Sequence, residues 1–418
     1  MITWTDLRRE PFRLLFPLSL LFGLLGVNHW LFYALGWMPS YSGLTHASIQ
    51  LQTYLFGFIV GFLLTALPRF TASAPATSVE LLLILSLLIA QAGLLLTRTW
   101  IAAEGCFIGL LMMLAVFAGR RVLTRRSGIS PPTEFVWIPL SLLYGVAGAG
   151  LLIVGQTGHL PSWLFRMAQS LAQQASVLGI VVGVSGFMGP RLMGRAFLQV
   201  TPSDVSPQQA RQIRRRRLAW HLVAALSFGA SFVVEGLGAI GPAYLLRASA
   251  ITAELVWTTR LWHPPTVPDL YVTYVWVALW MIVLGLWGAG LAPARRVVML
   301  HFVFLGGMSL LVFAVSTMVV LSHAGEAARL QQPSWPLRLM GVGLVGALLT
   351  RVVAEWSPER FFPLLAVAAI CWDVSAVSWF VMAWPRVWRA IPEGAFERMH
   401  DAAKRQILNT SSSSPSAC

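Results

Sequence analysis

Eight histidines are the residues of this chain best suited to metal chemistry, because imidazole binds both haem iron and copper. His29, His46 and His301 lie near the same end of their hydrophobic segments. His323 follows His301 by twenty-two residues, or about 33 Å along one helix, so these two cannot share a metal. The sequence therefore predicts a metal site formed by His301, His46 and His29. The alternative, a hydrogen-bonded histidine that binds nothing, stays open for each of the three.

Charged side chains inside the hydrophobic segments are a second chemical signal, since a charge in hydrocarbon is costly and marks pairing or function. Asp373 lies near the middle of one segment, and Glu235 and Arg247 lie at similar depths in two consecutive segments. We expect Glu235 and Arg247 to form an ion pair and Asp373 to have a functional role. The chain has no Walker loop, GxSxG or HExxH motif, so no enzymatic activity is assigned.

Long hydrophobic segments must position these residues. The 418 residues are 57% hydrophobic and 11% charged, against about 25% charged in soluble domains. Apolar runs of about twenty residues recur along the chain, which is typical of a polytopic membrane protein. The sequence predicts an all-α transmembrane bundle in one domain, residues 1–405, with a disordered tail at 406–418. Twelve spans are expected, at 14–36, 47–67, 79–97, 101–119, 135–155, 167–188, 218–240, 242–259, 269–291, 297–321, 336–353 and 361–384. The boundaries between spans are least well defined over 79–119 and 218–259.

The basic residues indicate how these spans are oriented. Thirty basic residues against sixteen acidic ones give a net charge of +14. Twenty-three of the thirty fall on one side of the twelve spans, many of them in the basic inner loop 189–217, which predicts that both termini are cytoplasmic. Because the charge is spread over short loops, the expected partner is the lipid bilayer and not nucleic acid. Three widely spaced cysteines exclude a disulfide scaffold.

Four stretches of the sequence carry a family resemblance. They are Pro11-Phe12-Arg13, the segment 55–70 reading LFGFIVGFLLTALPRF, Gly189-Pro190-Arg191, and the segment 301–325 reading HFVFLGGMSLLVFAVSTMVVLSHAG. Together they resemble the NnrS family of twelve-span bacterial membrane proteins, over nearly the whole chain. The resemblance implies a protein of the bacterial cytoplasmic membrane that contains haem and copper. It also implies a role in the response to nitric oxide and nitrosative stress.

The chain departs from the family at the start of the second span. Family members carry a Trp-His-x-His-Glu-Met pattern just before the LFGF stretch, and here Gln50 and Gln52 stand at the two histidine positions. Tyr271 stands where the ninth span of the family often has a histidine. An amide binds haem iron or copper less well than imidazole does. The tenth-span histidines are retained as His301 and His323, so the resemblance implies His301 as a ligand in a site rebuilt with His46 or His29.

Two other functions fit the same sequence. Twelve spans with buried charges and amides also suit a transporter or channel for a small solute or ion. A relative without the family histidines also suits a non-catalytic subunit of a respiratory membrane complex, with respiratory-chain or self-association partners. No internal repeat of the transporter type is apparent by inspection. An optical spectrum, a flux measurement and co-purification would separate the three functions.

The orientation can be tested with reporter fusions. Fusions after Arg126 and after Gln209 should report the cytoplasm, and a fusion after His159 should report the opposite side. The reason is the excess of basic residues on the predicted inner side. The opposite result at any one of the three positions contradicts the predicted topology.

Overall fold

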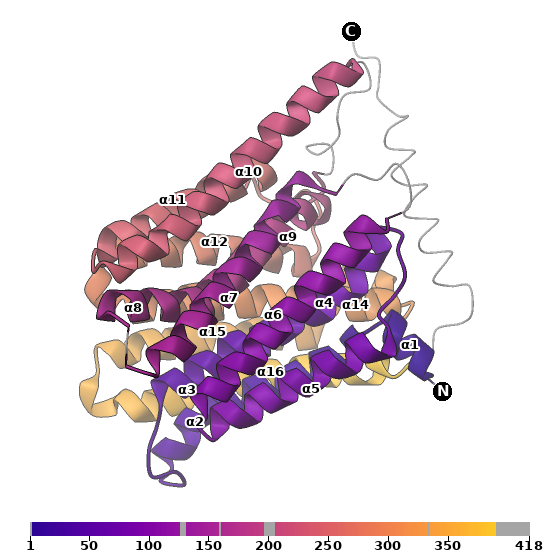
Figure 1. The fold of residues 1–418 in the computed structure, drawn as a ribbon. Coiled ribbons are helices and arrows are strands. Elements are labelled where there is room, and N and C mark those ends of the chain that lie inside the picture. Colours follow the sequence, from indigo (N-terminus) through magenta and orange to yellow (C-terminus); the bar gives the residue numbers. More distant parts are fainter. Residues whose placement is uncertain (1, 126–130, 159, 196–204, 333, 390–418) are drawn as a thin grey trace.

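The hydrophobic segments form helices, because in hydrocarbon the backbone N–H and C=O groups can bond only to one another. The computed structural model describes residues 2–125, 131–158, 160–195, 205–332 and 334–389. Within these residues it contains helices joined by turns and no strand (Figure 1). The predicted all-α polytopic bundle is therefore confirmed. The tail predicted at 406–418 lies outside the described residues.

Most of the helices run unbroken. A short helix, α1 (Trp4–Arg9), comes first, and the unbroken long helices are α2 (Phe12–Ala34), α5 (Ser78–Leu96), α6 (Trp100–Leu123), α7 (Trp137–Gly155), α10 (Pro207–Gly236), α11 (Ile240–Thr259), α12 (Leu270–Leu291), α15 (Trp335–Glu355) and α16 (Phe361–Val387). Short 3₁₀ turns are η2 (Thr133–Val136), η5 (Pro293–Arg295), η7 (Ala327–Gln331) and η8 (Pro358–Arg360).

Three spans of the described chain are composite, with a π-helical segment between two α-helical ones. The second span consists of α3 (Gly43–Ser48), η1 (Ile49–Leu55) and α4 (Phe56–Phe70). The sixth consists of α8 (Ser162–Ser170), η3 (Leu171–Ala175) and α9 (Ser176–Leu192). The tenth consists of α13 (Arg296–His301), η6 (Phe302–Ser309) and α14 (Leu310–His323). π-Helical segments are rare in proteins overall, and those that occur often lie at functional sites.

Eleven helical spans in the described residues are long and apolar enough to cross a membrane. The remaining expected span, α11, is a helix of 20 residues that is not among the eleven. Arg247 and Glu254 lower its mean hydropathy. It packs against both α10 and α12, so it belongs to the same bundle.

Reciprocal capping bonds set the starts of two long helices. At the start of α5 the Thr77 hydroxyl accepts from the Glu80 N–H, and the Glu80 carboxylate accepts from the Thr77 N–H. Ser206 and Gln209 repeat this arrangement at the start of α10. Such bonds satisfy N–H groups that the first helical turn leaves without partners. As a result the segment expected as a basic inner loop at 189–217 is helical from Pro207 onward.

An internal repeat organises the bundle. Residues 17–26 read PLSLLFGLLG and residues 139–148 read PLSLLYGVAG, a shift of 122 positions. The same shift, without any gap, relates the Pro-Arg pair at 68–69 to that at 190–191, and η1 to η3. Because the shift spans four helices, the two copies have the same orientation and are parallel repeats. This repeat is not apparent by inspection of the hydrophobic segments and is found by aligning the chain with itself.

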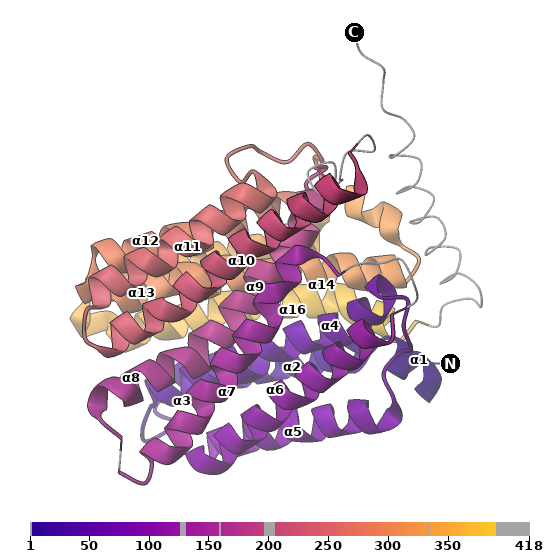
Figure 2. The same cartoon turned by 45° about the horizontal axis from the view of Figure 1, so that its top comes forward.

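Glycine allows the first two spans of each repeat to touch. A Cβ on Gly57 would collide with Ser19 of α2, and a Cβ on Gly179 would collide with Ser141 of α7. These two contacts are themselves related by the shift of 122. The second and sixth spans are 89% buried, against 39% for α5 and α6, so they form the centre of the bundle. Figure 2 shows α4 and α9 between α5 and α6 on one side and α10 to α12 on the other.

Close packing at Gly148 of α7 gives a test of this architecture. A Cβ there would meet the backbone N of Ala172 and the carbonyl of Ala168 at 2.8 Å, whereas a Cβ on Gly150 would meet nothing within 4 Å. Gly148→Ala should therefore reduce the free energy of unfolding by about 1–3 kcal/mol, because two backbones must move apart. Gly150→Ala should leave it unchanged or raise it slightly. Thermal unfolding in detergent measures both, and equal midpoints would contradict the packing described.

Candidate functional site

A cavity of about 580 Å³ lies at the end of the bundle that carries His46 and His301, called here the outer cavity. Each π-helical segment contributes to its wall, through Gln50 of η1, Gln173 and Gln174 of η3, and Phe304 of η6. Its aromatic walls include Trp30 and Trp372. The volume lies within the range of about 300–1,000 Å³ that small-molecule and cofactor sites have. The polar or charged side chains that line it are Tyr41, His46, Gln50, Tyr54, Gln169, Ser170, Gln173, Gln174, Glu235, Tyr244, Arg296, His301, Ser309 and Arg351.

The two histidines of the outer cavity are held in the same way. Nδ1 of His46 lies 2.8 Å from the carbonyl oxygen of Gly26, and Nδ1 of His301 lies 2.7 Å from that of Val297. A carbonyl oxygen only accepts, so Nδ1 carries the proton in both rings and Nε2 keeps its lone pair. This is how proteins orient histidines that bind metals through Nε2. The structure thus brings two of the three predicted metal ligands to one cavity.

His29, the third predicted ligand, is engaged elsewhere. Its Nε2 accepts a hydrogen bond from the backbone N–H of Ser42 at 2.6 Å, and it does not line the outer cavity. Trp30 stands beside both rings, with centroids 5.8 Å from His29 and 5.5 Å from His46. Within the described residues no group of three His, Cys, Asp or Glu side chains is placed to hold a metal ion.

The two glutamines at the family's histidine positions, Gln50 and Gln52, lie differently with respect to the outer cavity. Gln50 lines the outer cavity and donates to the carbonyl of Gly23 at 2.7 Å. Gln52 is fully buried away from the cavity, where its amide donates to Glu104 at 3.2 Å and accepts from Gln91 at 3.3 Å. Only position 50 therefore faces the space in which a ligand could bind.

Glu235 and Arg247 form a buried ion pair at the edge of the outer cavity. Arg247 Nη2 lies 2.7 Å from Glu235 Oε2, and its Nη1 donates to Gln174 at 2.8 Å. The guanidinium also stands 3.7 Å above the ring of Phe232. Tyr244 donates to Glu235 at 3.3 Å and lines the cavity. The pair predicted from depth alone is thus part of a hydrogen-bonded network that continues to the cavity wall.

Arg351 is a cavity residue that sequence reasoning missed. It is 7% exposed, and its Nη1 lies 3.5 Å from Glu355. Arg296 joins it on the wall. Both were counted only as loop charges near span ends, although an arginine one turn inside an apolar segment is itself a signal of a polar pocket.

Asp373 lies apart from the outer cavity. It is half-buried, and Asn28 of α2 donates to its carboxylate at 3.0 Å. The bond joins the first and last spans of the bundle, which also pack against each other along α2 and α16. The structure gives this residue a bridging contact.

His323 belongs to a second polar cluster at the opposite end of the bundle, called here the inner end. Its Nδ1 lies 2.7 Å from Glu10, which also pairs with Arg13 at 2.6 Å and with Arg69 at 3.3 Å. Burial of Glu10 opposes ionisation, but the bond to His323 and the charges of His323, Arg13 and Arg69 lower the pKa of Glu10 to about 2. The stabilisation from this carboxylate is present above its ordinary pKa of 4.5 and is lost only as the pH falls towards 2.

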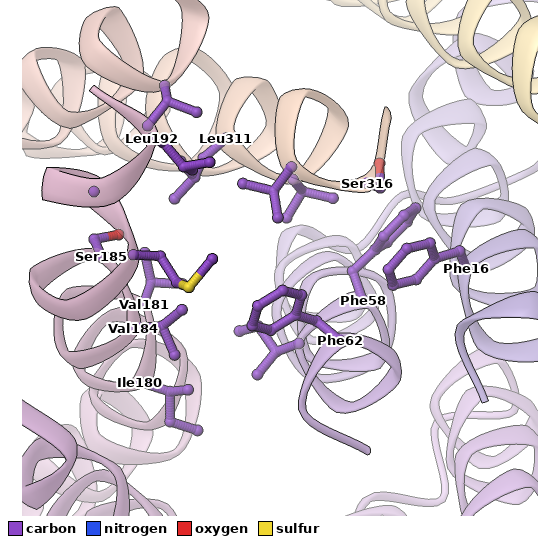
Figure 3. A pocket seen from close by; sticks show the side chains of 16 residues that line it. Phe16, Phe58, Phe62, Ile180, Val181, Val184, Ser185, Leu192, Leu311 and Ser316 are labelled. Atoms are coloured by element: carbon purple, nitrogen blue, oxygen red, sulfur yellow. The ribbon is translucent and has the colours of Figure 1, made fainter. Parts of the chain in front are cut away.

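An apolar layer separates the two polar ends along the central spans. A small pocket of about 70 Å³ lies in this layer. Figure 3 shows Phe58 and Phe62 on one side of it and Val181 and Val184 on the other. Its polar wall groups are the hydroxyls of Ser185 and Ser316. The lining of this pocket is thus apolar apart from two hydroxyl groups.

The fold and the cavity define a polytopic helical membrane protein with an internal ligand-sized site near one face. The NnrS protein family matches residues 6–390 of the chain, and the chain belongs to this family. No curated protein matches it.

The ion pair of Glu235 and Arg247 can be tested by a double-mutant cycle. Arg247→Met should lower the free energy of unfolding by about 3–5 kcal/mol, because Glu235 remains as a buried carboxylate without its cation. The double variant Arg247→Met/Glu235→Gln should recover much of that loss, since no buried charge is left. Thermal unfolding in detergent gives the values, with Arg360→Met as the control on an exposed arginine. An Arg247→Met protein as stable as the parent would contradict the pairing.

Proposed function

We propose that this protein binds haem in the outer cavity and acts in the response to nitric oxide or nitrosative stress, in the bacterial cytoplasmic membrane. Membership of the NnrS family supports the physiological role and the location. The observation that carries the haem assignment is the pair of imidazoles on one cavity, each with Nδ1 tied to a backbone carbonyl and Nε2 left to bind. Histidine is a common axial ligand of haem iron.

The rest of the cavity suits a porphyrin. Trp30, Phe304 and Trp372 provide flat aromatic surface for an apolar macrocycle. Arg296 and Arg351 provide guanidinium groups that pair with carboxylates such as the propionates of haem. When bound, haem would supply reversible binding of small diatomic ligands and one-electron chemistry.

The side chains of this chain would hold and insulate the group. His46 and His301 would orient it through rings fixed by Gly26 and Val297. Gln50, tied to Gly23, would lie close by as an amide donor. The apolar layer beneath the cavity would keep water and ions from the inner face away from the site.

The residues do not fit a separate copper site. The described chain offers no third His, Cys, Asp or Glu that could join the two cavity imidazoles around a copper ion. Cys106 and Cys371 are free thiols outside the cavity wall. We therefore propose haem without the copper that family resemblance implies.

One observation favours the transporter alternative. Parallel repeats that begin four spans apart, with a polar cavity bordered by both copies, also occur in transporters. Solute flux in liposomes, together with a haem-free spectrum, would support that function over the first.

The haem assignment predicts a spectrum that depends on two histidines. Purified protein titrated with haem should give a Soret band that is lost or strongly weakened in His301→Ala and in His46→Ala. The loss of affinity should exceed the 10–100-fold that removing an outer-shell partner costs. His263→Ala, in the loop between α11 and α12, is the control and should bind like the parent. Equal binding by all four proteins would contradict the assignment.

A second pair of variants tests the cavity geometry. Gln50→His should tighten haem binding, because position 50 lines the cavity. Gln52→His should not, because position 52 faces Glu104 and Gln91 instead. If the two variants behave alike, the cavity is not the binding site.

A further inference from the structure

We propose that a crevice between α6 and α7 binds an anionic phospholipid, with its acyl chain against the bundle and its headgroup at the arginine-rich inner end. The crevice has a volume of about 570 Å³ and is lined by α4, α6, α7 and α10. It lies where the first repeat meets the second, and Figures 1 and 2 show α6 and α7 side by side there. This site is separate from the outer cavity and does not depend on haem.

The walls of the crevice are apolar and open to the perimeter of the bundle. Met112 and Gly119 of α6 face Leu143 and Val146 of α7 across it. Met112 is 50% exposed and Leu143 is 59% exposed, so these walls look outward to where lipid chains lie. A hydrocarbon chain is an occupant that such walls accept without leaving a polar group unpaired.

Two arginines stand at the inner mouth of the crevice. Arg214 of α10 lines it and donates through Nη2 to the carbonyl of Pro131 at 3.2 Å. Arg125 donates through Nη1 to the carbonyl of Val122 at 2.6 Å, and Val122 also lines the crevice. Both side chains are exposed, and a guanidinium has five N–H donors, so each can also bind a phosphate oxygen.

The local charge favours an anionic headgroup. Glu134 of η2 is buried and points towards α9, where a Cβ on Gly186 would lie 3.3 Å from its Cγ. The other acidic side chain near this end of α6 in the described residues, Glu80 of α5, is paired with Arg121 at 2.5 Å and with Arg120 at 3.4 Å. It is therefore not available to neutralise Arg125 or Arg214. Basic pockets between membrane helices at the cytoplasmic side are typical sites for anionic lipid headgroups.

Lipid retention tests the headgroup side of the proposal. The protein, without haem, is placed in nanodiscs with equal amounts of phosphatidylglycerol and phosphatidylcholine, and native mass spectrometry counts the lipids that stay bound. The parent should retain phosphatidylglycerol preferentially. Arg214→Gln should reduce this preference about fivefold, which is the effect of one basic residue at an anionic surface. Arg211→Gln, exposed on the same helix but outside the crevice, should change it less than about twofold.

A second pair of variants tests the acyl-chain side. A Cβ on Gly119 or on Gly105 would meet nothing within 4 Å, so leucine at either position of α6 is compatible with the fold. Gly119→Leu should obstruct part of the crevice and lower the retention of phosphatidylglycerol. Gly105→Leu lies outside the crevice and should retain it like the parent.

The outcomes separate this proposal from the function proposed above. Equal retention of the two lipids by the parent, or equal retention by the two leucine variants, would overturn the lipid site. Thermal unfolding of each variant verifies that it is folded. Because the measurement uses protein without haem, its failure leaves the haem assignment unaffected, and a failed haem titration leaves the lipid site unaffected.

Discussion

Contact between small residues is the interaction on which the arrangement of this bundle depends. In lipid no hydrophobic force holds one span against the next, so spans must approach closely enough for dispersion and polar contacts to act. Gly57 meets Ser19 and Gly179 meets Ser141, once in each repeat. These contacts place the second and sixth spans at the centre and at matching depth. Their π-helical segments then border a single cavity, together with η6 of the tenth span.

The two polar ends of the central spans use similar residues for different purposes. At the inner end Glu10 pairs with His323, Arg13 and Arg69. His323 is thus part of a contact that holds three segments of the chain together. At the outer end His46 and His301 use only one ring nitrogen on the protein backbone. The arrangement around Glu10 stabilises the fold. The arrangement of His46 and His301 leaves the lone pair of each Nε2 available, as a ligand site requires.

Hydropathy and charge were enough to predict the helices and the pair of Glu235 and Arg247, because both depend on properties of single residues and their depth. The joint placement of His46 and His301 followed from the same reasoning. Arg351 and Gln173 were not predicted as cavity residues, since hydropathy does not reveal which helix face borders a cavity. For Gln173 that face also depends on the π-helical segment η3. His29 lies outside the cavity lining, with its Nε2 bonded to the Ser42 backbone. That bond depends on how the chain turns between two spans, which hydropathy does not reveal. The internal repeat is present in the sequence itself, but it is detected only by aligning the chain with itself.

The π-helical segments η1 and η3 can also be compared between the two copies of the repeat. One extra residue in a helix turns everything beyond it by about 100°, so a deletion within η1 would rotate α3 and withdraw His46 from the cavity. Segments η1 and η3 align without a gap under the shift that relates the repeats. The extra residue is therefore common to both copies of the repeat. The two copies therefore share the π-helical segment but not the histidine, because the position matching His46 in the other copy is Ala168.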